Sequence, residues 1–93
     1  MRIKYSERAL RDSAWFRQYY GSVFPAGREN AAQSLINLQS LLKVHPYIGQ
    51  RVPNMESVRR MPIPKTPFVL IYRVTETQIE VLRLRDSRQG RDG

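Results

Sequence analysis

The chain has 93 residues, of which 41% are hydrophobic and 26% are charged, and none is a cysteine. Its net charge is +8, and 13 of its 16 basic residues are arginine. This composition is typical of one soluble domain with a single core, and it excludes disulfides and thiolate metal sites. Arginine suits phosphates and carboxylates, so the charge favours a nucleic acid or an acidic protein as partner over a basic surface that serves solubility alone.

The sequence also bounds the location and the cofactors. No apolar run approaches the roughly 20 residues that a membrane-spanning helix needs, and residues 1–12 lack the apolar stretch of a signal peptide. We therefore expect a cytoplasmic protein that makes no membrane contact. No glycine-rich phosphate loop and no cluster of His, Asp and Glu occurs, so no cofactor and no metal is expected.

The first half of the chain predicts one strand and two helices. Residues 2–6 alternate between basic and apolar side chains, which indicates a short strand. Ser6 is a suitable N-cap for a helix over residues 7–20, which Gly21 and Pro25 would end. An apolar stripe predicts a second helix over residues 27–44.

The second half predicts a loop followed by three strands. Residues 46–56 contain two prolines and a glycine and are expected to form a loop. Alternation then predicts strands over residues 57–63, 68–74 and 79–85, with Pro62 restricting the first of them to an edge or a bulge. We expect one domain over residues 1–89 and a polar tail over residues 90–93. The expected fold is α+β, in the order β-α-α-β-β-β, with two antiparallel helices on one face of a small, mostly antiparallel sheet.

The strand over residues 68–74 is apolar on both faces. Phe68, Leu70, Tyr72 and Val74 alternate with Val69, Ile71 and Arg73. Two helices cover one face of such a sheet, and no segment remains to cover the other. Contiguous exposed apolar surface usually marks a binding site, so we expect a second chain to cover this face. A sheet that curls on itself and a homodimer are the alternatives.

The element order and three blocks of sequence resemble the RelE/ParE superfamily of toxins from type II toxin–antitoxin modules. The resemblance extends from Ile3 to Gln89. Its most specific parts are "TPFVLIYRV" at residues 66–74 and "IEVLRLRDSRQ" at residues 79–89. The third block is formed by Leu42, Pro46, Ile48, Gly49 and Val52.

The resemblance implies one of two activities. RelE-like members cut messenger RNA in the ribosome, whereas ParE-like members poison DNA gyrase. Both are neutralised by an antitoxin whose C-terminal segment packs on apolar surface of the toxin. The resemblance thus implies a partner for the uncovered face that the alternation predicts.

The residues at the nuclease positions form an incomplete set. Where RelE-like nucleases carry a phosphate-binding arginine, this chain has Val69. Arg60 stands where they carry a catalytic lysine, and its pKa is too high for a general base. Arg88, beside Gln89, lies near another arginine of the family. If the chain were a nuclease, Arg60 and Arg88 would be its catalytic residues, and none is assigned otherwise.

Two further groups of residues are candidates for binding. Arg83 and Arg85 share a face of the last strand, and we expect them to contact the target together with Arg60 and Arg88. An antitoxin contact for the same arginines is the alternative. Phe16 and Tyr20 are expected in the core. The residues expected to contact the antitoxin are Trp15, Tyr19, Val69, Ile71 and Arg73.

Arg73 has a second interpretation. A single arginine on an apolar face is a suitable anchor for a carboxylate of a partner, but an ion pair with Glu80 or Glu76 across the hairpin would also explain it.

These observations favour a ParE-like toxin that binds DNA gyrase and has no catalysis of its own. A RelE-like ribonuclease with an incomplete site, acting on ribosome-bound mRNA, and an inactive relative that only binds its antitoxin are the alternatives. The expected partner is an antitoxin with an acidic C-terminal segment, encoded beside this gene, in a heterotetramer or a larger complex.

Overall fold

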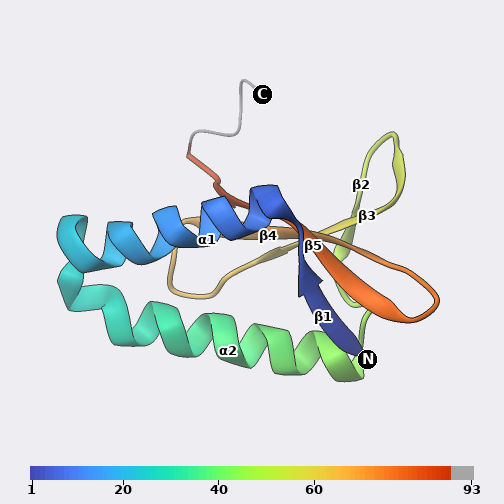
Figure 1. The fold of residues 1–93 in the computed structure, drawn as a ribbon, viewed down its shortest axis with the longest axis horizontal. Coiled ribbons are helices and arrows are strands. Elements are labelled where there is room, and N and C mark those ends of the chain that lie inside the picture. The colour runs from blue at the N-terminus through green and yellow to red at the C-terminus, as the bar shows by residue number, and fades with distance from the viewer. Residues whose placement is uncertain (89–93) are drawn as a thin grey trace.

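In the computed structural model of the chain the described residues are 1–88, except for the side chain of Glu56. Gln89 and the predicted tail over residues 90–93 lie outside them. Helices α1 (Glu7–Gln18) and α2 (Arg28–Val44) run antiparallel and lie on one side of a sheet (Figure 1). The chain reverses between them through a π-helical turn at Tyr19–Val23 and a short 3-10 turn at Pro25–Gly27.

The sheet contains five strands in the order β1-β5-β4-β3-β2. Only the pair β1·β5 is parallel, and the other pairs are antiparallel. The predicted α+β fold is therefore confirmed. The strands are β1 (Arg2–Tyr5), β2 (Gln50–Val52), β3 (Met55–Pro62), β4 (Phe68–Val74) and β5 (Gln78–Asp86).

The first helix starts where the sequence predicts and ends earlier. The hydroxyl of Ser6 accepts a hydrogen bond from the backbone N–H of Ala9 at 3.0 Å, which caps the first turn of α1. The α-helical pattern ends at Gln18, and the N–H of Phe24 then donates to the carbonyl of Tyr19 at 2.9 Å. That bond spans five residues and makes the last turn a π-turn, which apolar spacing alone does not distinguish from an α-turn.

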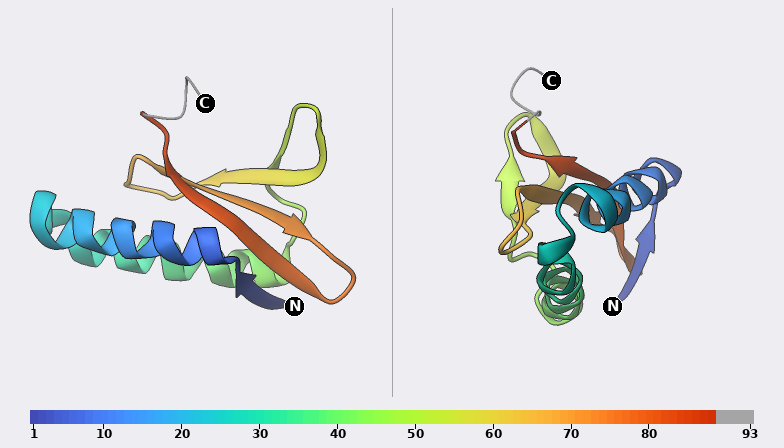
Figure 2. Two further views of the ribbon diagram at one scale, coloured as in Figure 1. Left: turned by 45° about the horizontal axis from the view of Figure 1, so that its top comes forward. Right: turned by 90° about the vertical axis from the view of Figure 1, so that its left-hand side faces the viewer.

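The predicted loop over residues 46–56 is wrong in one segment. Residues 50–52 form β2, which pairs with β3 through Gln50↔Arg60 and Arg51↔Arg59. Three residues are too few to show an alternation, so the strand was not visible in the sequence. In Figure 2 the β2–β3 hairpin projects from the sheet. Asn54, with a φ of 64°, makes its turn.

Pro62 is the last residue of β3, opposite Val69 of β4. The pairing of β3 with β2 extends no further than Arg60, so the missing N–H of Pro62 costs no ladder bond on that side. Pro62 is thus accommodated at the end of a strand, where its missing N–H removes no ladder bond to β2.

The core lies between the helices and one face of the sheet. Phe68, Leu70 and Tyr72 of β4 meet Phe16 of α1 and Leu42 of α2 there, and all five are almost completely buried. The rings of Phe16 and Phe68 are 4.8 Å apart in an edge-to-face arrangement. Phe16 and Tyr20 are core residues, as predicted. Within residues 1–88, no helix has the length and apolar character needed to cross a membrane.

Candidate partner-binding surfaces

Val69, Ile71 and Arg73 of β4 lie on the face of the sheet opposite the core. Residues paired across antiparallel strands share a face, and Val69 pairs with Arg85 while Ile71 pairs with Arg83 and Arg60. Val69 is only 6% exposed, yet it does not belong to the core cluster. No helix covers this face, as the alternation in the sequence predicted.

A groove of about 730 Å³ opens on this face. We call it the open-face groove. Its floor is apolar, and its rim carries the polar and charged side chains Ser6, Glu7, Arg8, Arg83 and Arg85. The apolar residues that line it are Val52, Met55, Val58, Ile71 and Leu82. Met55 is 52% exposed, so the groove presents apolar surface to solvent.

A β-bulge in β5 decides which residues of that strand face the groove. Ile71 pairs with Arg83 and the next residue, Tyr72, pairs with Val81, so Leu82 is an extra residue in β5. Val81 and Leu84 therefore both reach the core, although three positions separate them. Without the bulge, Arg83 would share the core face with Val81.

Three arginines stand on the face of the groove. Arg60, Ile71 and Arg83 lie in one row across β3, β4 and β5, which places the two arginines about 10 Å apart at normal strand spacing. Arg85 lies in the neighbouring row, opposite Val69. Among the described residues, the side chains of Arg60 and Arg85 form no hydrogen bond or ion pair, so their guanidinium groups are available to a partner.

Arg83 is held in place by Asp12 of α1. Its Nε donates to Oδ2 of Asp12 at 2.7 Å, and the backbone N–H of Leu84 donates to the same oxygen at 3.0 Å. The hydrogen bond that Arg83 donates to Asp12 raises the pKa of Arg83 above its ordinary value. Strand β1 pairs with β5 only as far as Val81. Beyond that point β1 offers no backbone partner to β5, and the carboxylate of Asp12 accepts the hydrogen bond instead. This role was not predicted from the sequence, because Asp12 and Leu84 are far apart along the chain.

A second hollow, of about 210 Å³, lies at the end of β5. We call it the β5-end pocket. It is lined by Asp12, Trp15, Phe68, Arg83, Leu84, Arg85 and Asp86. Trp15 is 44% exposed, stacks on Tyr19 with 5.6 Å between ring centroids, and contacts Phe68. Arg83 and Arg85 line both this pocket and the open-face groove.

Arg88 is anchored beside this pocket. Its guanidinium donates to both oxygens of Asp86, at 2.7 and 3.0 Å, and lies over the ring of Tyr19 with 5.7 Å to the centroid. These bonds hold the pKa of Asp86 below its ordinary value, although burial of the carboxyl group opposes the shift. The same carboxylate raises the pKa of Arg88. Arg88 is thus an internal partner of Asp86.

The structure divides the residues that the sequence assigned to antitoxin binding. Val69, Ile71 and Arg73 share the face of the open-face groove. Trp15 and Tyr19 lie at the end of α1, beside the β5-end pocket and Arg88. The aromatic pair therefore groups with the arginines assigned to the target rather than with the apolar face of the sheet.

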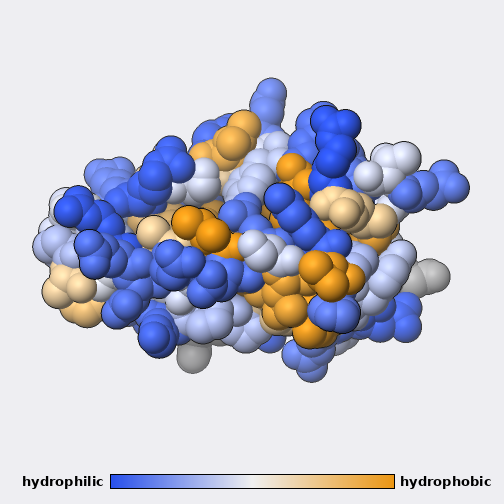
Figure 3. Space-filling view, turned by 90° about the horizontal axis from the view of Figure 1, so that it is seen from below, coloured by the Kyte–Doolittle hydropathy of each residue, from blue (hydrophilic) through white to orange (hydrophobic). Residues whose placement is uncertain are grey.

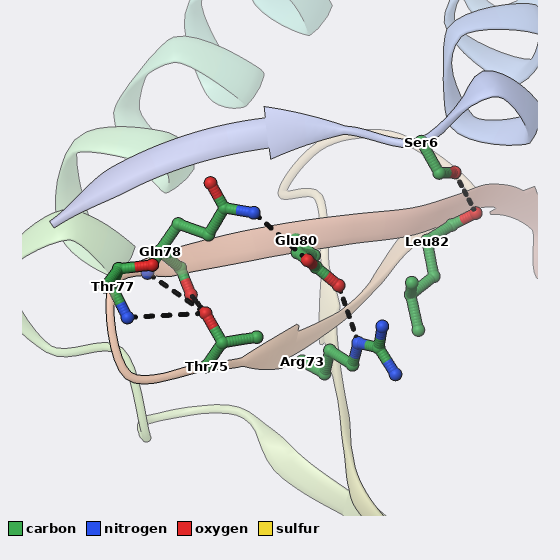
Figure 4. A network of polar contacts seen from close by, with 7 residues as sticks. All are labelled: Ser6, Arg73, Thr75, Thr77, Gln78, Glu80 and Leu82. Carbon is green, nitrogen blue, oxygen red and sulfur yellow. Dashed lines mark hydrogen bonds and ion pairs between the residues drawn. The ribbon is translucent and has the colours of Figure 1, made fainter.

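Arg73 has a partner across the hairpin (Figure 4). Its Nε lies 2.6 Å from Oε1 of Glu80, and the side-chain amide of Gln78 donates to the other oxygen of that carboxylate at 3.0 Å. The hydrogen bond from Arg73, followed by that from Gln78, lowers the pKa of Glu80. In the turn, the Thr75 hydroxyl accepts from the backbone N–H of Gln78. The pairing with Glu80 that the sequence offered as an alternative is present.

The residues at the nuclease positions are not brought together. Arg60 lies on the open face, whereas Arg88 lies against Tyr19 and Asp86. Val69 packs between Pro62 and Arg85. His45 is exposed at the end of α2, where its backbone N–H donates to the carbonyl of Leu41 at 2.8 Å. Among the side chains that the structure describes, no group of three or more His, Asp or Glu residues is placed to hold a metal ion.

Comparison with known proteins gives a consistent result. A solved structure described as "Chromosomal ParDE TA system from P. aeruginosa" superposes with a TM-score of 0.69 over 92% of this chain and 95% of that chain. At 24% sequence identity this similarity shows the fold alone. No curated protein matches the chain. Residues 3–90 match the family profile "ParE toxin of type II toxin-antitoxin system, parDE", so the chain belongs to the ParE toxin family.

Proposed function

We propose that this chain is the toxin of a type II toxin–antitoxin module, that it inhibits growth by binding DNA gyrase, and that a cognate antitoxin neutralises it. The observation that carries the proposal is the open-face groove in a chain of the ParE family. The groove is apolar, faces solvent and has arginines at its rim. A protein that acts by binding needs such a surface for its partners, and it needs no catalytic group.

The groove is suited to an acidic, amphipathic segment. Its floor, which includes Val58 and Ile71, offers apolar contact, and its rim offers Arg8 and Arg85 to carboxylates. Apolar anchors provide affinity in a protein interface, and charges at the rim provide orientation and a fast association rate. We therefore assign the groove to the C-terminal segment of the antitoxin.

The target surface includes Arg60, Arg83, Arg85 and the exposed indole of Trp15. Arg83 and Arg85 lie between the groove and the β5-end pocket. An antitoxin seated in the groove covers these two arginines and so keeps them from the target. Neutralisation then follows from competition for shared residues and requires no conformational change in the toxin.

The site offers little support for RNA cleavage. Attack by the 2′-hydroxyl of RNA needs a group that accepts its proton, and arginine is too basic for that role. On this face, strand β5 carries the carboxylate of Glu80. That carboxylate has a lowered pKa and forms an ion pair with Arg73. The ribonuclease of the RelE type therefore stays the alternative.

Two assays with purified toxin test the proposal. We expect inhibition of DNA supercoiling by gyrase, no cleavage of ribosome-bound mRNA, and relief of the inhibition by the antitoxin encoded beside this gene. Cleavage of mRNA without any effect on gyrase would overturn the proposal. Silence in both assays, with antitoxin binding retained, would identify an inactive relative.

The proposal also predicts where the protein acts and in what form. A toxin that binds gyrase acts in the cytoplasm and is stored there as a complex with its antitoxin. We propose that this complex is a heterotetramer or a larger assembly of toxin and antitoxin. Light scattering on the co-expressed pair measures this stoichiometry.

A further inference from the structure

Trp15 is the only tryptophan of the chain, and its indole stands at the β5-end pocket. Tyr19 stacks on it at an interplanar angle of 21°, and Phe68 contacts it at 56°. These contacts fix the orientation of the indole, yet 44% of the residue stays exposed. The core does not require this exposure, because α1 buries Phe16 instead. The chain therefore presents a flat, oriented aromatic ring to solvent beside a pocket.

The pocket offers a ligand little apolar surface apart from this indole. Phe68 and Leu84 belong to its lining, but they are only 1% and 3% exposed. The other four lining residues are charged: Asp12, Arg83, Arg85 and Asp86. An apolar side chain of a protein partner would find a single apolar wall here. A planar polar ring stacks on the indole and forms hydrogen bonds with the charged walls, so it fits this lining better.

Three arginines around the indole are available to a ligand. Arg8 and Arg11 precede Trp15 by about two turns and one turn on the same side of α1, and Arg85 lines the pocket from β5. Among the described residues, the side chains of Arg8 and Arg85 form no hydrogen bond or ion pair. Arg11 lies 3.8 Å from Glu7, and both side chains are largely exposed. Such a surface pair is weak, so all three guanidinium groups can bind an anion near the indole.

The carboxylates of the pocket do not cancel this positive charge. Asp12 forms an ion pair with Arg83 and Asp86 forms one with Arg88, each with an N–O distance of 2.7 Å. The guanidinium beside each carboxylate offsets its repulsion of an anion. Oδ1 of Asp12 receives only a long bond of 3.3 Å from Arg83, so it retains room for a donor such as an amino group.

The positive charge of the chain is not evenly distributed. Residues 7–19 and 82–88 together contain six arginines and three acidic residues. The range 30–50, which includes most of α2, contains one charged residue, Lys43. Figure 3 views the molecule from the side on which α2 lies and shows apolar side chains gathered toward the end where α2 finishes. A polyanion is therefore attracted to α1 and the end of β5 more than to most of α2.

We propose that the β5-end pocket binds single-stranded nucleic acid. One base stacks on the indole of Trp15, and the arginines at positions 8, 11 and 85 bind the phosphates on either side of it. Every base has a flat face that stacks on an aromatic side chain, and guanidinium groups bind phosphate oxygens through paired hydrogen bonds. The bases of a duplex already stack on one another, so a duplex offers this pocket phosphates alone.

The inference deepens the proposed function, on which the source of the strand rests: a toxin that binds gyrase meets the DNA that gyrase holds. It assigns the β5-end pocket to nucleic acid and leaves the open-face groove to the antitoxin. Arg8 and Arg85 also line the groove, so an antitoxin seated there should displace the strand. Binding of a strand to the isolated chain needs no gyrase, so the two proposals fail separately.

The fluorescence of Trp15 provides the first test, because no other tryptophan contributes to the signal. A short DNA strand that cannot pair with itself should quench this fluorescence through stacking. The same strand in a duplex should not quench it, and a strand of equal length without bases should bind about tenfold more weakly. The logarithm of the binding constant should fall with the logarithm of the salt concentration with a slope of about −2, as expected for about three phosphate contacts.

Substitutions provide the second test, read by the anisotropy of a labelled strand. Trp15→Ala should weaken binding about tenfold, whereas Trp15→Phe, which keeps a flat ring, should stay within about threefold of the parent chain. Arg85→Glu should weaken binding and make the salt slope shallower by about 0.7. Arg28→Glu makes the same charge change at the exposed start of α2 and should leave the slope unchanged. An unchanged circular dichroism spectrum shows that each variant is folded.

Equal binding of the strands with and without bases, or of single strand and duplex, would reduce the site to general attraction of phosphates and overturn the inference. Quenching by an acidic peptide but by no strand would also overturn it, because the pocket would then belong to a protein. Inhibition of supercoiling without any strand binding would overturn this inference and leave the proposed function intact. Binding of an RNA strand in preference to DNA would support the pocket and count against gyrase as the target.

Discussion

The carboxylate of Asp86 holds the guanidinium of Arg88 through two hydrogen bonds, and Arg88 in turn lies over the ring of Tyr19. The Asp86 side chain is 4% exposed, whereas that of Arg88 is 58% exposed. Asp86 is therefore the buried end of a link that ties the end of β5 to the end of α1. The link also fixes where the chain leaves the sheet, beside the β5-end pocket.

The Asp86–Arg88 pair makes the stability depend on pH. The pKa of Asp86 is lowered in the folded state, so its charged form stabilises the fold above the ordinary carboxyl pKa of about 4, and this contribution is lost as the pH falls through the lowered value. Asp86→Asn should reduce the urea midpoint at pH 7. The difference from the parent chain should shrink as the pH falls below about 4. A difference that stays constant from pH 7 to pH 3 would contradict the assignment.

Two neighbouring residues of β4 separate folding from binding. Leu70 is fully buried in the core, and Ile71 lines the open-face groove. Leu70→Asp should cost more than about 4 kcal/mol and abolish cooperative unfolding, because it buries an unpaired charge. Ile71→Asp should leave the circular dichroism spectrum unchanged and weaken antitoxin binding more than about a hundredfold in calorimetry.

The control for Ile71→Asp is Thr77→Asp, which adds the same charge at an exposed position of the β4–β5 turn. It should bind antitoxin within about twofold of the parent chain. If both variants bound equally well, the antitoxin would not occupy the groove.

Arg85 is the best single residue for testing the target surface. It forms no ion pair among the described residues, whereas Arg83 holds Asp12 and would disturb the fold if replaced. Arg85→Glu should raise the concentration needed to inhibit supercoiling by about tenfold or more, with little change in the urea midpoint. Arg28→Glu makes the same charge change at the exposed start of α2 and should leave inhibition unchanged. Equal losses in the two variants would mean that net charge alone sets the potency.

The sequence predicted the features that depend on local periodicity. Both helices, the limits of β4 and the uncovered face with Val69 and Ile71 follow from the spacing of apolar residues. Leu82 as a bulge residue and Asp12 as the partner of Leu84 were missed, because each depends on hydrogen bonds between distant segments. Strand β2 was missed because it is too short to show a period.

The sequence did not predict which of the candidate site residues lie together in the fold. Trp15 and Tyr19 were expected to share a partner with Ile71, but they lie with Arg88 at the other surface. Spacing along a helix identifies which residues leave its buried face. It does not show which strand end they meet, because that depends on the direction in which the helix crosses the sheet.

Gly49 and Tyr72 form a contact that explains the glycine after Ile48. The hydroxyl of Tyr72 accepts a hydrogen bond from the N–H of Gly49 at 2.9 Å and donates to the carbonyl of Pro46 at 2.8 Å. A Cβ at position 49 would come within 2.6 Å of that hydroxyl and 3.0 Å of the carbonyl of Arg60. The buried hydroxyl therefore holds the loop before β2 only when residue 49 has no side chain.

A double-mutant cycle tests this contact. Gly49→Ala should cost about 2–4 kcal/mol through overpacking and loss of the hydrogen bond, and Tyr72→Phe about 1–2 kcal/mol. In the double variant the clash with the hydroxyl is gone, so the cost should be at least about 1 kcal/mol smaller than the sum of the two. Urea unfolding of the four proteins measures the coupling. Strict additivity would show that the contacts which remain in the double variant, with ring carbon Cε1 of residue 72 at 2.9 Å and the carbonyl of Arg60 at 3.0 Å, exclude a side chain at position 49.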